Sequence, residues 1–193
     1  METQTSKITP SFVQNSVEFT VGSIVIYPGH GKCIIHGVET RQVDGKPLRF
    51  YKLEILKSTL SRSNRPEPAI WLPVHSAQER GLRVPIIAAD TQIVMAALLS
   101  REYYFRLNEP WPSVQPKIES LIRIEGALGL AKAVSYTYVA IKKQLVPPVE
   151  IVRFNEHVTK VLFRELSEAM KEPIRNLEEK INRGLRQKLL PDT

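Results

Sequence analysis

The segment from Phe19 to Gly31, FTVGSIVIYPGHG, constrains the fold of this chain most strongly. Its first part is rich in β-branched and aromatic residues, which suit the half-buried surface of a strand. The stretch that begins at Pro28 then breaks the strand, because proline lacks an amide donor and glycine accepts a positive φ. A second run of β-forming residues follows at 33–38. A short strand that turns through a glycine-rich corner is typical of the start of a small barrel.

The pattern continues as short strands up to about Arg83. We expect four of them, at residues 19–27, 33–41, 48–57 and 69–75. Asp44-Gly45 between the second and the third is a strong hairpin turn signal. Residues 58–68 are polar and contain two prolines, so they predict a loop. Residues 1–17 are polar and patternless, and we expect a flexible tail there.

The periodicity changes to helical spacing after Pro85. Asp90-Thr91 can cap a helix whose apolar positions include Val94 and Leu98. Further helices are expected at 117–124, 128–144, 149–171 and 174–190. The sequence thus predicts an α+β chain, with a β domain at 18–84 and an all-α domain at 85–193.

Composition excludes several classes of protein. Among 193 residues there is no apolar run near the roughly 18 that span a membrane, and residues 1–7 lack the apolar core of a secretory signal. The one cysteine, Cys33, cannot form an internal disulfide. These features indicate a cytoplasmic protein with no membrane partner.

The net charge of +7 favours a polyanionic partner, nucleic acid above all. A mildly basic surface without such a partner is the alternative. Residues 1–100 carry 11 Lys and Arg against 8 Asp and Glu, and residues 101–193 carry 16 against 12. Because neither half is a polybasic arm, any basic patch must be assembled by folding.

Two short motifs suggest chemistry that the local pattern does not support. His30, Cys33 and His36 are metal-binding residue types, but alternation along a strand points Cys33 and His36 to opposite faces. The stretch from Gly29 to Lys32 lacks the Ser or Thr and the helix of a phosphate-binding loop. With no nucleophile–base spacing evident, we expect no metal, no cofactor, no small-molecule substrate and no enzyme activity.

The strand pattern resembles a known family. FTVGSIVIYPGHGKCIIHGVETR, at 19–41, resembles the opening of the CarD-like bacterial transcription regulators, and of the RNA-polymerase-interacting domain of transcription-repair coupling factor. The pattern continues through Gly45, 50–53, 72–74 and 81–83. Trp111 and the later helical run at 162–166 resemble the family's C-terminal DNA-binding domain, so the likeness extends to about residue 170.

The resemblance implies a fold and a function. Residues 18–84 would form a Tudor-like (SH3-like) barrel that docks on the β subunit of RNA polymerase. Residues 85–193 would touch promoter DNA, weakly and without sequence specificity, and would stabilise or modulate the open complex. The protein would then associate with the bacterial nucleoid through polymerase.

Two residues are candidates for polymerase binding. In CarD-like proteins an arginine at the place of Arg41 contacts the β-subunit lobe, although a solvated strand-end arginine is the alternative. Alternation along the strand places Trp71 on the face opposite to Ile70 and Leu72. If those two fill the core, Trp71 is exposed, as at an interface.

Five residues are candidates for DNA binding. In the family, a tryptophan at the place of Trp111 packs into the minor groove beside the melted promoter, where an apolar wedge holds unstacked bases. A core anchor where helices meet is the alternative for Trp111, although its flanking prolines favour a rigid, displayed side chain. The possible phosphate contacts are Lys117, Arg123, Arg153 and Lys160.

A second function stays open. Family members usually carry arginines after the tryptophan, whereas residues 112–116 here are Pro-Ser-Val-Gln-Pro. Residues 172–193 also extend beyond the resemblance and add a basic helix. Both departures favour a protein-interaction module that binds polymerase or another partner without touching DNA. A metal-dependent enzyme, resting on His30, Cys33 and His36, is a more remote third reading.

Overall fold

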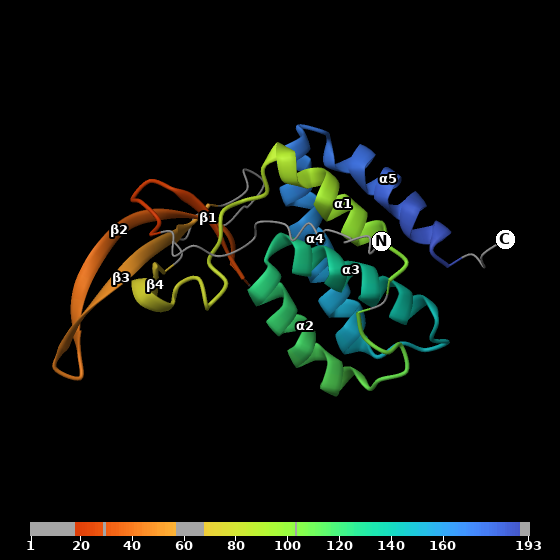
Figure 1. The fold of residues 1–193 in the computed structure, drawn as a ribbon, viewed down its shortest axis with the longest axis horizontal. Helices are drawn as coiled ribbons and strands as arrows, with labels where there is room; N and C mark the ends of the chain where they lie inside the picture. The colour runs from red at the N-terminus through yellow and green to blue at the C-terminus, as the bar shows by residue number, and fades with distance from the viewer. Residues whose placement is uncertain (1–17, 29, 57–67, 103, 190–193) are drawn as a thin grey trace, which may run out of the picture.

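The computed structural model describes residues 18–28, 30–56, 68–102 and 104–189. An antiparallel sheet comes first and a group of helices follows (Figure 1). The strands are β1 (Ile24–Tyr27), β2 (Gly31–Val43), β3 (Lys46–Ile55) and β4 (Ile70–Pro73), and the 3-10 turns are η1 (Val74–Ser76) and η2 (Ala88–Asp90). The helices are α1 (Thr91–Leu99), α2 (Trp111–Glu125), α3 (Ala127–Lys142), α4 (Val149–Met170) and α5 (Ile174–Gln187). The predicted α+β class is confirmed; the expected tail at 1–17 and most of the expected loop at 58–68 lie outside the described residues.

A long β2–β3 hairpin dominates the sheet, whose strand order is β1-β2-β3-β4. Val43 pairs with Lys46, which leaves a two-residue turn between the strands. Asp44 has φ 50° and Gly45 has φ 75°, the pair of positive values that the tightest hairpin turn requires. The turn that Asp44-Gly45 predicts is therefore confirmed, and it fixes the register of the hairpin.

The concave side of the sheet holds the first core. Its buried side chains are Phe19, Val25, Cys33, Ile35, Tyr51, Leu53, Leu72, Ala77 and Leu82. A register shift between Ile35 and Gly37 marks a β-bulge, which bends the strand over this core. The four strands do not close on themselves; instead Ile26 exchanges backbone hydrogen bonds of 2.8 and 3.1 Å with Arg83. This return of the chain to β1 gives the sheet its barrel-like shape.

Helix α2 starts six residues before the predicted start at residue 117. Pro110 caps it and Pro112 lies in its first turn, where a missing amide costs no intrahelical hydrogen bond. Pro116 lies inside the helix, which continues to Glu125. The predicted helix start at residue 117 is thus too late, because prolines near a helix start are tolerated.

Helix α3 lies at the centre of the helical domain. It contacts α1, α2 and α4, and ten of its residues are buried. Gly129 allows α2 to approach closely, since a Cβ there would stand 2.3 Å from the carbonyl oxygen of Leu121. At the start of α1, Asp90 makes no side-chain cap hydrogen bond, contrary to expectation, whereas Thr91 Oγ1 donates to the Ala88 carbonyl at 2.8 Å.

A buried ion pair joins the sheet to the helices. Arg83 Nη1 and Nη2 donate to the two carboxylate oxygens of Glu165 on α4, at 2.6 and 2.8 Å. The Ile86 amide also donates to this carboxylate at 2.8 Å. The Glu165 side chain is 6% exposed and that of Arg83 is 19% exposed. Gly126 makes room for the arginine, because a Cβ there would meet Arg83 Cδ at 2.7 Å.

We predict that Glu165→Ala lowers the free energy of unfolding by about 3–5 kcal/mol, because it leaves the Arg83 charge without its buried partner. Glu168→Ala is the matched control on the same helix. Its carboxylate pairs with Lys32 at 2.6 Å, but the two side chains are 48% and 35% exposed. This control should cost less than about 1 kcal/mol. Urea unfolding followed by circular dichroism measures both; equal losses would contradict the prediction.

Lys188, just after α5, is a buried lysine. It is 7% exposed, and its ammonium donates to Ser135 Oγ on α3 and, at 3.4 Å, to the Leu98 carbonyl at the end of α1. The lysine therefore links three helices and faces the negative end of α1. Burial lowers the pKa of Lys188 from its ordinary value of 10.5 to about 8.

We predict that Lys188 makes stability rise with pH. Below pH 8 both the folded and the unfolded chain hold the proton, and the cost of burying the charge is complete. Between about 8 and 10.5 the folded protein has released a proton that the unfolded chain still binds, so the free energy of unfolding increases. Chemical unfolding across this range should show the rise in the native protein relative to Lys188→Met. Parallel profiles for the two proteins would refute this role.

Candidate functional site

The convex side of the sheet carries the candidate partner-binding surface. Residues opposite one another in antiparallel strands share a face, and Val38, Tyr51 and Leu72 are aligned towards the core. Their neighbours along each strand therefore point outward. We define the outer face as Glu39, Arg41, Leu48, Phe50, Lys52, Trp71 and Pro73.

Arg41 and Trp71 meet on this outer face. The Arg41 guanidinium carbon stands 3.4 Å from the Trp71 ring centroid, and Lys52 Nζ stands 5.5 Å from it. Glu39 lies 3.6 Å from Arg41 Nη2, and the Arg41 side chain remains 44% exposed. A guanidinium stacked on an indole is attracted by the ring and is held in one orientation. The fold thus brings together the two residues predicted to bind polymerase, although β3 separates their strands.

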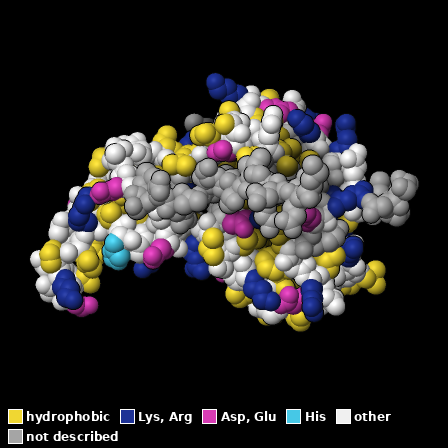
Figure 2. Space-filling model, viewed as in Figure 1, with side chains coloured by type: hydrophobic (Ala, Val, Ile, Leu, Met, Phe, Trp, Pro, Cys, Tyr) yellow, Lys and Arg dark blue, Asp and Glu magenta, His cyan; other side chains and the backbone are white. Residues whose placement is uncertain are grey.

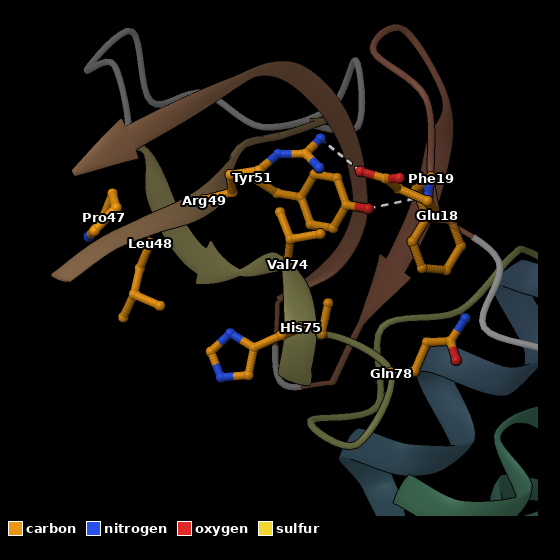
Figure 3. A pocket seen from close by; sticks show the side chains of 10 residues that line it. Glu18, Phe19, Pro47, Leu48, Arg49, Tyr51, Val74, His75 and Gln78 are labelled. Carbon is orange, nitrogen blue, oxygen red and sulfur yellow. Dashed lines mark hydrogen bonds and ion pairs between the residues drawn. The ribbon is translucent and has the colours of Figure 1, made fainter. Parts of the chain in front are cut away.

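The sheet domain also contains a cavity of about 560 Å³, which borders the outer face at Leu48 (Figure 3). Two interactions connect the residues that line this cavity. The Glu18 carboxylate lies 2.5 Å from Arg49 Nη2, and the Tyr51 hydroxyl accepts a hydrogen bond from the Phe19 amide at 3.0 Å. Burial raises the pKa of Tyr51. The cavity pairs its one carboxylate with its one arginine, so its charges are balanced within the chain. We assign it no ligand.

The residues of metal-binding type point in different directions. Cys33 is fully buried in the first core, whereas the His36 side chain is 62% exposed. His30 stacks on Tyr27, with ring centroids 5.3 Å apart. Across the described ranges, no group of three or more His, Cys, Asp and Glu side chains is placed to hold a metal ion. The strand alternation that separates Cys33 from His36 is as the sequence predicts.

Trp111 lies in a buried cluster and is only 9% exposed. It points inward with Val114 and Ile118 from one face of α2, and its ring centroid lies 5.2 Å from that of Phe154 on α4. Its Nε1 atom has no hydrogen-bond partner among the described residues. Of the two alternatives for Trp111, the burial agrees with the core anchor and contradicts the displayed side chain, because the prolines begin a helix whose apolar stripe includes Trp111. A wedge role in DNA would require the ring to leave this cluster.

The four basic candidates are distributed over two helices, α2 and α4. Arg153 and Lys160 are exposed on α4, while Lys117 is on α2 and pairs with Glu109. The hydrogen bonds from Lys117 and Ser113 lower the pKa of Glu109. Arg123 lies at the other end of α2, near Gly81 of the sheet domain and about 18 Å along the helix from Trp111. Figure 2 shows Lys and Arg side chains interspersed with Asp and Glu over the visible helical surface.

The structure also contains site features that the sequence analysis did not identify. Glu165 lies among the buried Leu162, Phe163 and Leu166, and an acidic residue on an apolar helix face signals a buried partner. The exposed apolar residues Leu145 and Val146 lie in the turn between α3 and α4. In the sequence, the exposed turn could have been recognised from two apolar residues that directly precede Pro147 and Pro148, because the prolines end the helix there.

Comparison with known protein families relates the sheet domain to one of them. Residues 19–83 match the family model for the CarD-like/TRCF RID domain. By this match the segment is similar to CarD-like/TRCF RID domains, and we call it the RID domain. Domains of this family are Tudor-like, non-catalytic modules that interact with RNA polymerase. The match ends at Arg83, the residue that binds Glu165. A search among curated proteins found no match to the chain. No helix in the described parts of the chain is long and apolar enough to cross a membrane.

We predict that Trp111→Ala lowers the free energy of unfolding by about 3–5 kcal/mol, the usual cost of deleting a large buried aromatic side chain. Trp71→Ala is the control, because Trp71 is only half-buried on the outer face of the RID domain and should cost distinctly less. Urea unfolding followed by circular dichroism reports both changes without depending on tryptophan fluorescence. A Trp111→Ala protein as stable as the native chain would show that the ring is not an anchor.

Proposed function

We propose that this protein is a transcription regulator that binds the β subunit of RNA polymerase and modulates the promoter open complex. The RID domain supplies the polymerase contact through its outer face, and the helical domain contacts promoter DNA. The observation that supports this proposal best is the Arg41–Trp71 pair, displayed on a domain of a polymerase-interacting family.

The outer face has the composition of a protein interface. Trp and Arg are the residue types that most often dominate binding energy, and here they are already in contact. Trp71 also lies on β4, which pairs only with β3 among the described strands. The outer edge of β4 can therefore accept a partner strand through backbone hydrogen bonds. Such a strand would lie beside the Arg41–Trp71 pair, which would add a side-chain contact.

Tethering explains how modest DNA contacts could matter. A domain bound to polymerase raises the effective concentration of a weak DNA site at the promoter. Lys117, Arg153 and Lys160 are exposed on the helical domain, and the Arg83–Glu165 pair holds that domain against the RID domain. If the helical domain binds melted promoter DNA more tightly than duplex DNA, it shifts the equilibrium from the closed to the open complex, by an amount set by the ratio of the two affinities.

A protein-interaction module without DNA contact is the second candidate function. The burial of Trp111 and the distance of Arg123 from it favour this candidate, because they divide the expected DNA-binding residues. The lifetime of promoter open complexes, measured with and without the protein, separates the two functions. A change in lifetime supports DNA contact, whereas binding to polymerase with no change supports the interaction module.

We predict that Arg41→Glu weakens binding of the full chain to the isolated β lobe of polymerase by roughly 1–3 kcal/mol, because it reverses a charge at the interface. Arg49→Glu is the matched control. Arg49 is also on the hairpin and also pairs with a glutamate, but strand alternation places it on the face opposite to Arg41, where it lines the cavity. Calorimetric titration measures both affinities. If folded Arg41→Glu protein binds the β lobe with the same affinity as the native protein, Arg41 is not part of the interface.

A further inference from the structure

A cleft of about 430 Å³ lies between the RID domain and the helical domain. Its lining residues come from β1, from the end of the RID domain, and from α2, α3 and α4. Pockets of roughly 300–1,000 Å³ at domain interfaces are common sites for small molecules. The cleft includes neither member of the Arg41–Trp71 pair and neither lysine proposed to contact DNA, so the proposed function does not account for it.

The wall of the cleft is apolar. Three buried residues line it, Ile26 of β1, Leu130 of α3 and Val158 of α4. Phe154 and Val161 of α4 are half-buried and line it as well. Because water forms no hydrogen bonds with such a wall, the cleft favours a ligand with an apolar body.

Two arginines from different domains stand at the rim of the cleft. Arg80 of the RID domain and Arg123 of α2 line it with exposed side chains, and neither forms an ion pair within the described ranges. Arg80 Nε donates to Ser76 Oγ at 3.1 Å. Arg123 Cγ would lie 3.5 Å from a Cβ on Gly81, which places Arg123 beside the turn that carries Arg80. Both guanidinium charges are therefore available to a ligand.

The other charges of the cleft do not balance these two. The Arg83 guanidinium is already paired with Glu165, at 2.6 Å. Glu119 of α2 is the one acidic residue among the described residues that line the cleft, and its carboxylate accepts from the Gln115 amide at 2.8 Å. His157 of α4 adds an imidazole ring that can donate a hydrogen bond. The cleft thus combines an apolar wall with an excess of positive charge.

We propose that this cleft binds a small organic anion, with its apolar body against the wall and its carboxylate or phosphate group between Arg80 and Arg123. Guanidinium groups bind both kinds of anion through paired N–H donors. The apolar wall favours an organic ligand over inorganic phosphate, because it offers such an ion no polar contact. Since the two arginines belong to different domains, the bound ligand links the RID domain to the helical domain.

The test uses the full chain and two dyes that share one ring system. 8-Anilinonaphthalene-1-sulfonate is anionic, and N-phenyl-1-naphthylamine lacks the charged group. We expect the anionic dye to bind at one saturable site and to raise the melting temperature, because it links the two domains. Fluorescence titration measures the affinity for each dye.

Arg80→Gln and Arg123→Gln each remove one charge from the rim. Arg175→Gln is the matched control, because Arg175 lies on α5 with a side chain that is 88% exposed and does not line the cleft. We expect each rim variant to bind the anionic dye about tenfold more weakly, since it loses a charge-assisted hydrogen bond, and to bind the neutral dye as the native protein does. The control should match the native protein with both dyes. Val161→Phe, which fills the cleft, should weaken the binding of both dyes.

Competition with 1-naphthoate and 1-naphthyl phosphate distinguishes the two anionic groups, and the compound that displaces the anionic dye at the lower concentration identifies the group that the cleft prefers. The proposal is overturned if the anionic dye does not bind, if both folded rim variants bind it as tightly as the native protein, or if neither competitor displaces it. Displacement by a hexaglutamate peptide at equal concentration would overturn it in favour of an acidic segment of a partner protein. None of these outcomes depends on polymerase or DNA, so the proposed function and this site are tested separately.

Discussion

The Arg83–Glu165 ion pair is the interaction on which the arrangement of this molecule depends. Both charges are largely withdrawn from water, and the carboxylate also accepts the Ile86 amide. Such a pair adds little to net stability, because desolvation offsets most of the attraction, but separating its members exposes each to a large cost. The pair therefore favours one placement of the helices against the RID domain over any looser placement.

This placement sets the outer face of the sheet and the far end of the helices at a fixed distance from each other. The Arg41–Trp71 pair lies on the convex side of the sheet, and the α3–α4 turn lies at the end of the helices remote from it. A rigid joint between them means that docking one surface also positions the other. The geometry suits a protein that reads two parts of a single assembly, and it does not require either contact to be strong.

Local chemistry made the sheet predictable. The positive-φ turn at Asp44-Gly45 and the alternation that buries Leu72 and displays Trp71 follow from neighbouring residues. The errors came from non-local or cooperative effects. The sequence left Trp111 open between a displayed wedge and a core anchor; the prolines favoured display, whereas in the fold they begin a helix that packs the ring against Phe154. Arg83 and Glu165 are 82 positions apart, and no pattern in a single sequence pairs them.

The position of Arg83 limits how readily the sheet domain and the helical domain could be exchanged separately between proteins. Its backbone hydrogen-bonds to Ile26 of β1, and its side chain binds Glu165 of the helices, so the last residue of the matched segment contacts both units. Recombination that joined this RID domain to another helical domain would leave the Arg83 guanidinium without its carboxylate partner. The original helices would in turn keep a buried Glu165 carboxylate without its counter-charge. The joint thus makes the two modules mutually dependent, and an exchange would succeed only with a partner that brings its own acid to the same place.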